Sequence, residues 1–335
     1  MNRIKTENKE FKVVSLFSGI GGLDLGFENA GFNVIWANDF DKYAVQTYKA
    51  NIGNQIVLGD IYEQKENIPN HDILIGGFPC QPFSTLGSLK GFDDNRGTLF
   101  FLIKQIIQEH YPKIVVLENV KNLMNHNKGN TFQRIIRELD GIGYETTFSV
   151  LNSQDFGVPQ RRNRVFIVAF RKTKFKSFDF KFPTGEKLEI TTKDILDKEV
   201  DIKYFISKKM IDTILGYGTK GYIVKPTIDT DIAKTLTATM HKMHRASQDN
   251  YYTDKKNWDR FKDESKTIIR KLTPNEARRL QGFPDDWKHV VSDTQIYKQF
   301  GNAVTVNVSY RLAKELMNFI KINQRDWEKK DVLKS

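Results

Sequence analysis

Short apolar runs alternate with amphipathic stretches through the first half of the chain. The runs predict strands at 12–17, 33–37, 56–58, 72–75, 113–117 and 165–169. The stretches between them predict helices at 23–27, 41–50 and 98–110. Alternating strands and helices are typical of an α/β fold, here a mostly parallel, Rossmann-like open sheet with helices on both faces.

The pattern changes after Phe170. The segment 171–176 is basic, and no long apolar strand follows until about Gly221. This predicts a second, smaller and irregular domain over 189–296, with a first domain formed by 1–188 plus 297–335. Within the second domain, Thr273-Pro274-Asn275-Glu276 has the start signal of a helix at 276–281. The apolar stretch 303–320 predicts a last helix that can pack back on the first domain.

Composition narrows the class of protein. No apolar run approaches the roughly 18 residues of a membrane span, and residues 1–10 lack the apolar stretch of a signal peptide. The single cysteine, Cys80, excludes a disulfide framework and a cysteine-based zinc cluster. His241 and His244 have no third ligand in view, so no metal is expected. We therefore expect a cytoplasmic protein without a membrane partner.

Charge is distributed unevenly along the chain. Residues 1–170 carry 18 basic and 18 acidic side chains, whereas residues 171–335 carry 34 and 23, so the net charge of +11 lies in the second half. A basic half predicts a polyanion partner such as nucleic acid. A lysine-rich solvated surface explains the same charge, and charge alone does not separate the two.

A glycine turn follows the first predicted strand, and Asp39 lies twenty residues beyond Gly19. This spacing lets a ligand approach the backbone and places a carboxylate where ribose hydroxyls can donate to it. Asp24 stands where a dinucleotide fingerprint requires its third glycine. The pattern therefore favours an adenosyl ligand without a pyrophosphate.

Candidate catalytic groups follow the later strands. Cys80 comes after the strand at 72–75 and Glu118 after the strand at 113–117, at the edge of the sheet where ligands bind. Arg162 and Arg164 precede the strand at 165–169, and their alternate spacing predicts that both lie on one face of a strand. They would lower the pKa of a thiol or hold an anion. An inert thiol, a helix-capping carboxylate and a solvated basic edge remain open for these positions.

Eight short motifs occur together in a fixed order: FSGIGG (17–22), GDI (59–61), GFPCQPFS (77–84), RGTLF (96–100), ENV (118–120), QRRNR (160–164), LQGFP (280–284) and GNAV (301–304). With these motifs the chain resembles the DNA (cytosine-5-)-methyltransferases of prokaryotic restriction–modification systems. The resemblance covers most of the chain.

The resemblance implies an S-adenosylmethionine-dependent methyltransferase fold with a target-recognition domain, and a reaction on a cytosine flipped out of duplex DNA. It implies that the Cys80 thiolate adds to carbon 6, so that carbon 5 can take the methyl group and then lose its proton as Cys80 leaves. Glu118 would bond or protonate the ring nitrogen, and Arg162 and Arg164 would support the base and the catalytic loop.

The resemblance also implies binding residues. For S-adenosylmethionine these are Phe17, Gly19, Ile20, Gly22, Asp39, Phe40, Asp60, Ile61, Pro79, Leu99, Asn302 and Val304. For DNA they are Ser84, Gln81, Thr235, Leu236, Lys242 and Arg245. Asp39 stands where relatives often have glutamate. A cognate restriction endonuclease is the implied functional partner, and we expect a monomer because base flipping does not need a dimer.

Three alternatives stay in view. A tRNA cytosine methyltransferase shares the catalytic framework, but such relatives carry further cysteines that this chain lacks. A DNA-binding module that has lost catalysis would not need the intact catalytic positions. A nicotinamide dehydrogenase would leave Cys80, Glu118 and the basic half unexplained.

Overall fold

The computed structural model describes residues 11–78, 99–219 and 222–329. The chain divides into two compact units. The first, called here the sheet unit, comprises residues 2–152, 163–184 and 308–335. The second, called the inserted unit, comprises residues 153–162 and 185–307. The inserted unit thus begins before and ends after the domain predicted at 189–296, because residues 153–162 and 297–307 make most of their contacts within it.

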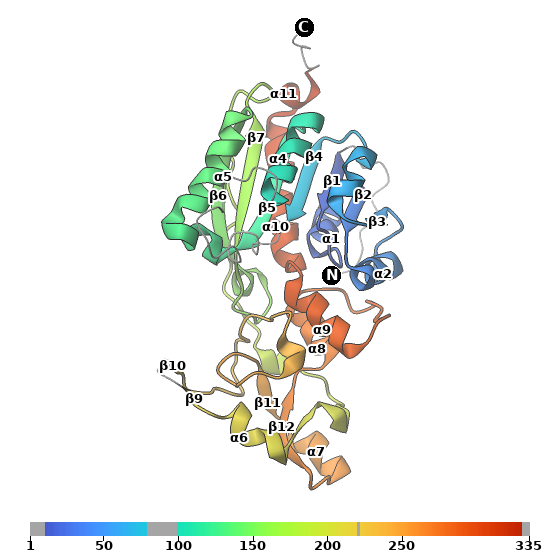
Figure 1. The fold of residues 1–335 in the computed structure, drawn as a ribbon, viewed down its shortest axis with the longest axis vertical. Helices are drawn as coiled ribbons and strands as arrows, with labels where there is room; N and C mark the ends of the chain where they lie inside the picture. The colour runs from blue at the N-terminus through green and yellow to red at the C-terminus, as the bar shows by residue number, and fades with distance from the viewer. Residues whose placement is uncertain (1–10, 79–98, 220–221, 330–335) are drawn as a thin grey trace. The chain divides into compact units, whose positions relative to one another are not determined.

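The sheet unit is built on a seven-stranded sheet with the order β3-β2-β1-β4-β5-β7-β6 (Figure 1). Its strands are β1 (Lys12–Leu16), β2 (Asn33–Asp39), β3 (Ile56–Leu58), β4 (Ile73–Gly77), β5 (Ile114–Val120), β6 (Tyr144–Asn152) and β7 (Asn163–Arg171). β7 runs antiparallel to both of its neighbours, whereas the pairs among β1 to β5 are parallel. The mostly parallel α/β sheet is therefore confirmed.

Six of the seven strands coincide with the predicted runs, and β6 was not predicted. β6 lies at the edge of the sheet and pairs only with β7 among the described strands. Its sequence YETTFSVLN mixes polar and apolar residues, and most of its side chains are only partly buried. An edge strand does not need the continuous apolar run that a central parallel strand shows.

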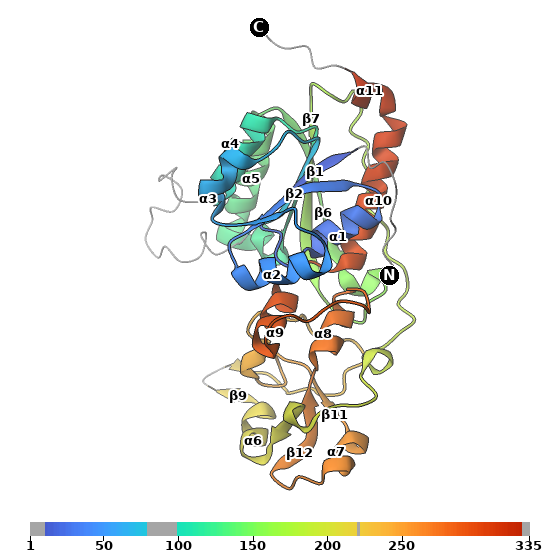
Figure 2. The ribbon, with the colours of Figure 1, turned by 90° about the vertical axis from the view of Figure 1, so that its right-hand side faces the viewer.

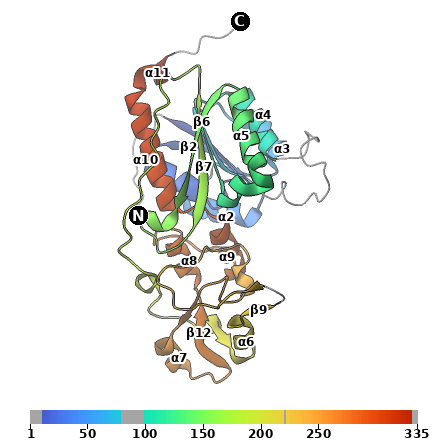
Figure 3. The same ribbon diagram turned by 90° about the vertical axis from the view of Figure 1, so that its left-hand side faces the viewer.

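Helices cover both faces of the sheet (Figures 2 and 3). One face is covered by α4 and α5, and the other by α1 and α10. The helices of this unit are α1 (Gly22–Asn29), α2 (Lys42–Asn51), α3 (Ile61–Gln64), α4 (Leu99–His110), α5 (Asn130–Gly141), α10 (Val306–Ile322) and α11 (Gln324–Glu328). Beneath α4 and α5 lies a large apolar core, which includes Leu74, Ile103, Val115, Ile135 and Leu139.

α10 packs closely on α1 in the sheet unit. A Cβ added to Gly26 would lie 2.0 Å from the Ser309 hydroxyl, so only glycine allows the two helices to meet there. The Ser309 hydroxyl donates to the Gly22 carbonyl at 2.8 Å. Phe319 of α10 stacks on Phe170 of β7, with ring centroids 4.4 Å apart. The predicted helix at 303–320 thus exists but begins at Val306, because Ala303 is extended and ends the preceding helix.

The inserted unit holds a three-stranded antiparallel sheet, a two-stranded ribbon and short helices. Its elements are β8 (Phe205–Ser207), β9 (Gly218–Thr219), β10 (Tyr222–Ile223), β11 (Tyr251–Thr253), β12 (Lys266–Lys271), α6 (Ile211–Ile214), α7 (Lys255–Phe261), α8 (Pro274–Leu280) and α9 (Asp293–Asn302). The predicted start of α8 is confirmed, with Thr273 and Glu276 forming a capping box.

A buried ion cluster ties this unit together. Arg270 of β12 is 1% exposed and forms ion pairs with Glu276 at 2.8 Å and with Asp254 at 2.7 Å. Burying one partner without the others would be strongly unfavourable, so the three side chains fix where β12, α7 and α8 meet.

None of the described helices is long and apolar enough to cross a membrane.

Candidate functional site

A strained turn joins β1 to α1 at the carboxyl edge of the sheet. Phe17 has a φ of 55° and Gly21 a φ of 84°, both in the left-handed region. At this φ any other residue would be strained, and its Cβ would also lie 2.2 Å from the Ile52 side chain and 2.8 Å from the Tyr48 ring. Phe17, Ser18 and Gly19 are half-buried, whereas residues 20–22 are buried, so only the first part of the turn is accessible to a ligand.

Asp39 is fixed at the end of β2 by this turn. Its Oδ2 accepts the Gly19 amide at 2.7 Å, and its Oδ1 accepts the Asp41 amide at 2.8 Å. A carboxylate oxygen is an acceptor of the kind that ribose hydroxyls require. The aspartate side chain, which is shorter than the glutamate found in many relatives, is thus held in place by the backbone of the turn.

Asp60 follows β3 at the same edge. Its Oδ1 accepts the Tyr62 amide at 3.0 Å and begins α3. Ile61 is buried beside it, and Asn38 donates to the carbonyls of Val57 and Gly59. These contacts place the β3 end next to the β2 end, so Asp39 and Asp60 belong to adjacent strand ends.

The residues at this edge fit an adenosine-type ligand. Among the residues that the structure describes, nothing lies within 4 Å of a Cβ built on Gly19. Phe40 is 75% exposed and supplies an aromatic face, as does the half-buried Phe17. Asp39 and Asp60 supply acceptors for hydroxyl and amino groups. Ile20 and Gly22 are buried under the turn, and Leu99 lies half-buried at the start of α4.

A buried carboxyl group lies beneath the turn. Asp24 of α1 is fully buried and accepts hydrogen bonds from Ser15 at 2.6 Å and from Tyr48 at 2.9 Å. The Ser18 hydroxyl donates in turn to that of Ser15 at 2.9 Å. Burial raises the pKa of Asp24 to about 7, because little solvent stabilises its charge. Asp24 thus anchors the turn from below, a role that its position in the sequence did not reveal.

This pKa predicts a pH-dependent stability. The ordinary pKa of an aspartate is 3.8 and that of folded Asp24 about 7, so between these values the folded protein keeps a proton that the unfolded chain releases. The contribution of Asp24 protonation to the free energy of unfolding is complete below pH 3.8 and is lost as the pH rises through 7. The loss amounts to at most about 1.4 kcal/mol per pH unit. Asp24→Asn should remove this dependence in Tm measured against pH. Parallel wild-type and variant profiles would contradict it.

Glu118 and Arg164 form an ion pair in the sheet unit. The Arg164 Nε lies 2.9 Å from the Glu118 Oε1, and both side chains are largely buried. The pairing of β5 with β7 brings them together, since Val120 lies opposite Arg164. A Cβ on Gly77 of β4 would lie 3.2 Å from the Glu118 Oε2. The second carboxylate oxygen of Glu118 therefore lies next to the end of β4, where Gly77 has no side chain.

Asn119 holds the end of β4 in place. Its Nδ2 donates to the Phe78 carbonyl at 2.9 Å, and its Oδ1 accepts the Val120 amide at 2.8 Å. The residue lies inside the quoted ENV motif, but no role was predicted for it. Pro79, Cys80, Gln81 and Ser84, which follow Phe78, lie outside the described residues.

Arg162 does not share a strand face with Arg164, contrary to the prediction. β7 begins at Asn163, so Arg162 precedes the strand and belongs to the inserted unit. Its guanidinium is 1% exposed and donates to the carbonyls of Leu236, Gly301 and Ala303 at 2.9, 3.1 and 2.7 Å. Arg162 therefore acts on backbone segments of its own unit.

Two buried glutamines continue this network. Gln160 accepts the Leu236 amide at 2.9 Å and donates to the Leu280 carbonyl at 2.7 Å. Gln281 accepts from Thr305 at 2.7 Å and donates to the Phe300 carbonyl. Both glutamines lie within the motifs QRRNR and LQGFP, but no role was predicted for either. Gln160 and Arg162 together hold Leu236, the first by its amide and the second by its carbonyl.

The other predicted contacts lie along the same unit. The Thr235 hydroxyl donates to the Arg161 carbonyl at 2.6 Å, Lys242 is exposed and Arg245 is half-buried. Asn302 is exposed and Val304 buried, and both belong to the inserted unit rather than to the first domain as predicted. The physical reason is that α9 packs within this unit, for example through Phe300 on Phe283.

No cluster of three or more potential metal ligands occurs among residues 11–78, 99–219 and 222–329.

Known proteins resemble the chain over most of its length. The family model described as C-5 cytosine-specific DNA methylase matches residues 11–318. Type II methyltransferase M1.ScrFI of Lactococcus lactis subsp. cremoris is 40% identical, over 94% of this chain and 80% of that protein. Type II methyltransferase M.NlaX of Neisseria lactamica is 42% identical, over 91% and 96%.

Solved structures share the fold at lower identity. The methyltransferase EhMeth of Entamoeba histolytica superposes with a TM-score of 0.71 at 22% identity, over 93% of this chain and 99% of that one. The S. pombe Dnmt2 methyltransferase gives 0.69 at 19% identity, over 92% and 99%. At these identities the likeness establishes the fold alone.

Proposed function

Because the chain belongs to the C-5 cytosine-specific DNA methylase family, we propose that it methylates carbon 5 of one cytosine within a specific duplex sequence. The protein is a cytosine-5 DNA methyltransferase of the type II restriction–modification family that uses S-adenosylmethionine. The base flipping, the covalent step and the individual residue roles given below are our proposal. The observation that supports them most directly is the Glu118–Arg164 pair beside the end of β4.

We propose that the carboxyl edge of β1, β2 and β3 holds the cofactor. Asp39 would accept the ribose hydroxyls, Asp60 and Ile61 would contact the adenine, and Phe17 and Phe40 would lie against its ring. Gly19, Ile20, Gly22 and Leu99 would shape the pocket, with Pro79, Asn302 and Val304 completing it. When bound there, S-adenosylmethionine supplies an electrophilic methyl group.

Catalysis would rest on three side chains. The Cys80 thiolate would add to carbon 6 of a flipped-out cytosine, which turns carbon 5 into a nucleophile. Glu118 would hold a proton at the ring nitrogen and stabilise the charge that develops there. Arg164 would fix the orientation of that carboxyl group through its 2.9 Å contact. After methylation, loss of the proton on carbon 5 would expel Cys80 and restore the ring.

DNA contacts would come from the inserted unit and from residues that follow Cys80 in the sequence. Thr235 and Leu236 would lie beside the vacated base position, Lys242 and Arg245 would contact the target, and Ser84 and Gln81 would reach the substrate strand. Arg162 would act as a positioning residue, because its three hydrogen bonds end on backbone carbonyls. We propose a monomer that works in the cytoplasm and protects DNA from a cognate endonuclease.

The test is transfer of labelled methyl from S-adenosylmethionine to unmethylated plasmid DNA and, separately, to tRNA. Label on DNA, mapped to one cytosine by bisulfite sequencing, would support the proposal and reveal the target. Label on tRNA alone would contradict the proposal and favour a tRNA cytosine methyltransferase. No label on either, with cofactor and DNA still bound, would indicate a binding module.

DNA affinity should fall steeply with salt. The second half of the chain carries 34 basic and 23 acidic residues, and cations at phosphates release counterions. With six or more phosphate contacts, the affinity should drop by about 10³-fold between 50 and 200 mM salt. Fluorescence anisotropy with labelled duplex DNA measures this slope. A flat profile would mean that the basic half does not face DNA.

A further inference from the structure

The backbone that leads into Thr235 and Leu236 is held on two opposite sides. On one side, residues 159–162 pair with it: the Arg161 amide donates to the Ala233 carbonyl at 2.8 Å, and the Ala233 amide to the Pro159 carbonyl at 2.8 Å. The other side is held by a residue far along the chain, in a segment to which no motif points.

That residue is Asn250. Its Oδ1 accepts the Lys234 amide at 2.8 Å, and its Nδ2 donates to the Lys234 carbonyl at 3.1 Å. The asparagine side chain thus replaces a neighbouring strand at this point, and it is 7% exposed. Because it both donates and accepts, Asn250 satisfies the two backbone groups of Lys234 that no strand pairs.

The residues on either side of Asn250 hold a second backbone position. The His244 amide donates to the Asp249 Oδ2 at 2.7 Å, and the Tyr251 hydroxyl donates to the His244 carbonyl at 2.6 Å. His244 lies between Lys242 and Arg245, the two predicted DNA contacts. The loop 235–248 carries all four DNA contacts predicted in this unit. Its backbone is held at Lys234, just before the loop, and at His244 by three consecutive residues, Asp249, Asn250 and Tyr251, which are called the clamp here.

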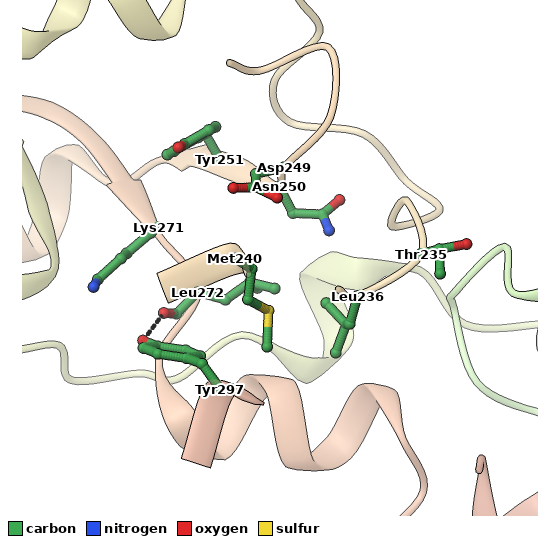
Figure 4. Close-up of a pocket in the computed structure, with 9 residues that line it drawn as sticks. All are labelled: Thr235, Leu236, Met240, Asp249, Asn250, Tyr251, Lys271, Leu272 and Tyr297. Atoms are coloured by element: carbon green, nitrogen blue, oxygen red, sulfur yellow. Dashed lines mark hydrogen bonds between the residues drawn. The ribbon is translucent and has the colours of Figure 1, made fainter. Parts of the chain in front are cut away.

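A small cavity beside the clamp shows how the middle of the loop is anchored. Met240 reaches in between Leu236 and Tyr297, with Leu272 behind it and Asp249 and Asn250 along the opposite wall (Figure 4). The Tyr297 hydroxyl donates to the Leu272 carbonyl at 2.5 Å, which fixes that ring. The space left is ≈ 20 Å³, about enough for one water. This space is too small for a nucleobase. We infer that the cavity holds the Met240 side chain and thereby anchors the middle of the loop.

We propose that Asp249 and Asn250 are positioning residues for DNA recognition, which set the conformation of the loop 235–248 before DNA arrives. This rests on the proposed function of that loop in DNA binding. A loop that is already ordered loses less conformational entropy on binding, so disturbing the clamp weakens DNA binding and target discrimination. Cofactor binding is unaffected, because the residues proposed for it lie in the sheet unit and at Asn302 and Val304, outside the loop 235–248.

The first test is Asn250→Asp. The carboxylate can still accept the Lys234 amide, but it places a second acceptor against the Lys234 carbonyl where the amide had donated. We expect the Kd for plasmid-derived duplex DNA, measured by anisotropy, to rise at least tenfold, and methylation to spread to near-cognate sites. The affinity for S-adenosylmethionine, measured by calorimetry, should stay within twofold. Asn275→Asp, an exposed asparagine in the same unit, is the matched control.

A second pair of variants guards against simple misfolding. Asp249→Asn keeps an oxygen that accepts the His244 amide and should bind DNA as the wild type does. Asp249→Ala removes that acceptor, so its affinity for DNA should fall at least fivefold. Unchanged DNA affinity in both Asn250→Asp and Asp249→Ala would overturn the inference. Equal losses of DNA and cofactor affinity would also overturn it, since they would indicate a general loss of structure. If the wild type binds DNA without methylating it, the proposed function fails, and the anisotropy comparison still decides the role of the clamp.

Discussion

Replacing Cys80 by serine is expected to abolish methyl transfer to DNA and to leave the binding of DNA and S-adenosylmethionine largely intact. A serine hydroxyl ionises far less readily than a thiol, so it supplies almost no anionic nucleophile at neutral pH. Transfer of labelled methyl to plasmid DNA measures the loss, and anisotropy and calorimetry measure the two binding reactions.

The single cysteine of the chain sharpens this experiment. A thiol-selective alkylating reagent can modify only Cys80, so it should inactivate the wild type with one equivalent incorporated. Bound DNA should slow the inactivation. Undiminished turnover in the serine variant would refute Cys80 as the nucleophile, whatever the reagent does.

Glu118→Gln is expected to lower kcat by about 10²- to 10⁴-fold, the usual contribution of a positioned general acid. The amide keeps the size of the side chain, but it cannot hold the acidic proton and weakens the contact with Arg164, now 2.9 Å long. Steady-state methylation of plasmid DNA measures the effect, and cofactor affinity should change little.

Two variants accompany this measurement. Arg164→Lys retains the charge but loses the planar group that holds Glu118, so it should show a smaller loss of kcat. Glu145→Gln is the matched control, because Glu145 lies on the edge strand β6 with only a loose ion pair of 3.9 Å to Lys172. A Glu118→Gln enzyme with wild-type kcat would assign the acid role to another group.

The strands of the sheet unit could be predicted from the sequence far better than the structure of the inserted unit. Central parallel strands are buried on both faces, so β1, β2, β4 and β5 appear as continuous apolar runs. The glycine turn and Asp39 also followed from local spacing. β6 was not predicted because an edge strand needs no such apolar run. Arg162 was wrongly placed on a strand face because β7 begins one residue after it.

The inserted unit depends on contacts between residues far apart in sequence. Asn250 meets Lys234 across 16 positions, and Gln160 meets Leu236 across 76. A polar residue that bonds to backbone leaves no periodic signal, since a carbonyl of any residue type serves as its partner. Asp24 was noted only as a missing glycine, and its buried hydrogen bonds to Ser15 and Tyr48 became visible only in the fold.

The close packing of α10 on α1 at Gly26 also bears on how the protein is made. In the sequence, residues 185–307 separate β7, the last strand of the sheet unit, from the part of α10 that belongs to this unit. On the ribosome, the face of the sheet that α10 covers must therefore wait while more than a hundred further residues are synthesised. Once residue 307 has left the exit tunnel, the nascent chain can complete its inserted unit, but it still exposes the apolar surface of α1 and β7. Premature termination should therefore yield aggregation-prone fragments, and enzymatic activity should appear only after α10 has been released from the exit tunnel.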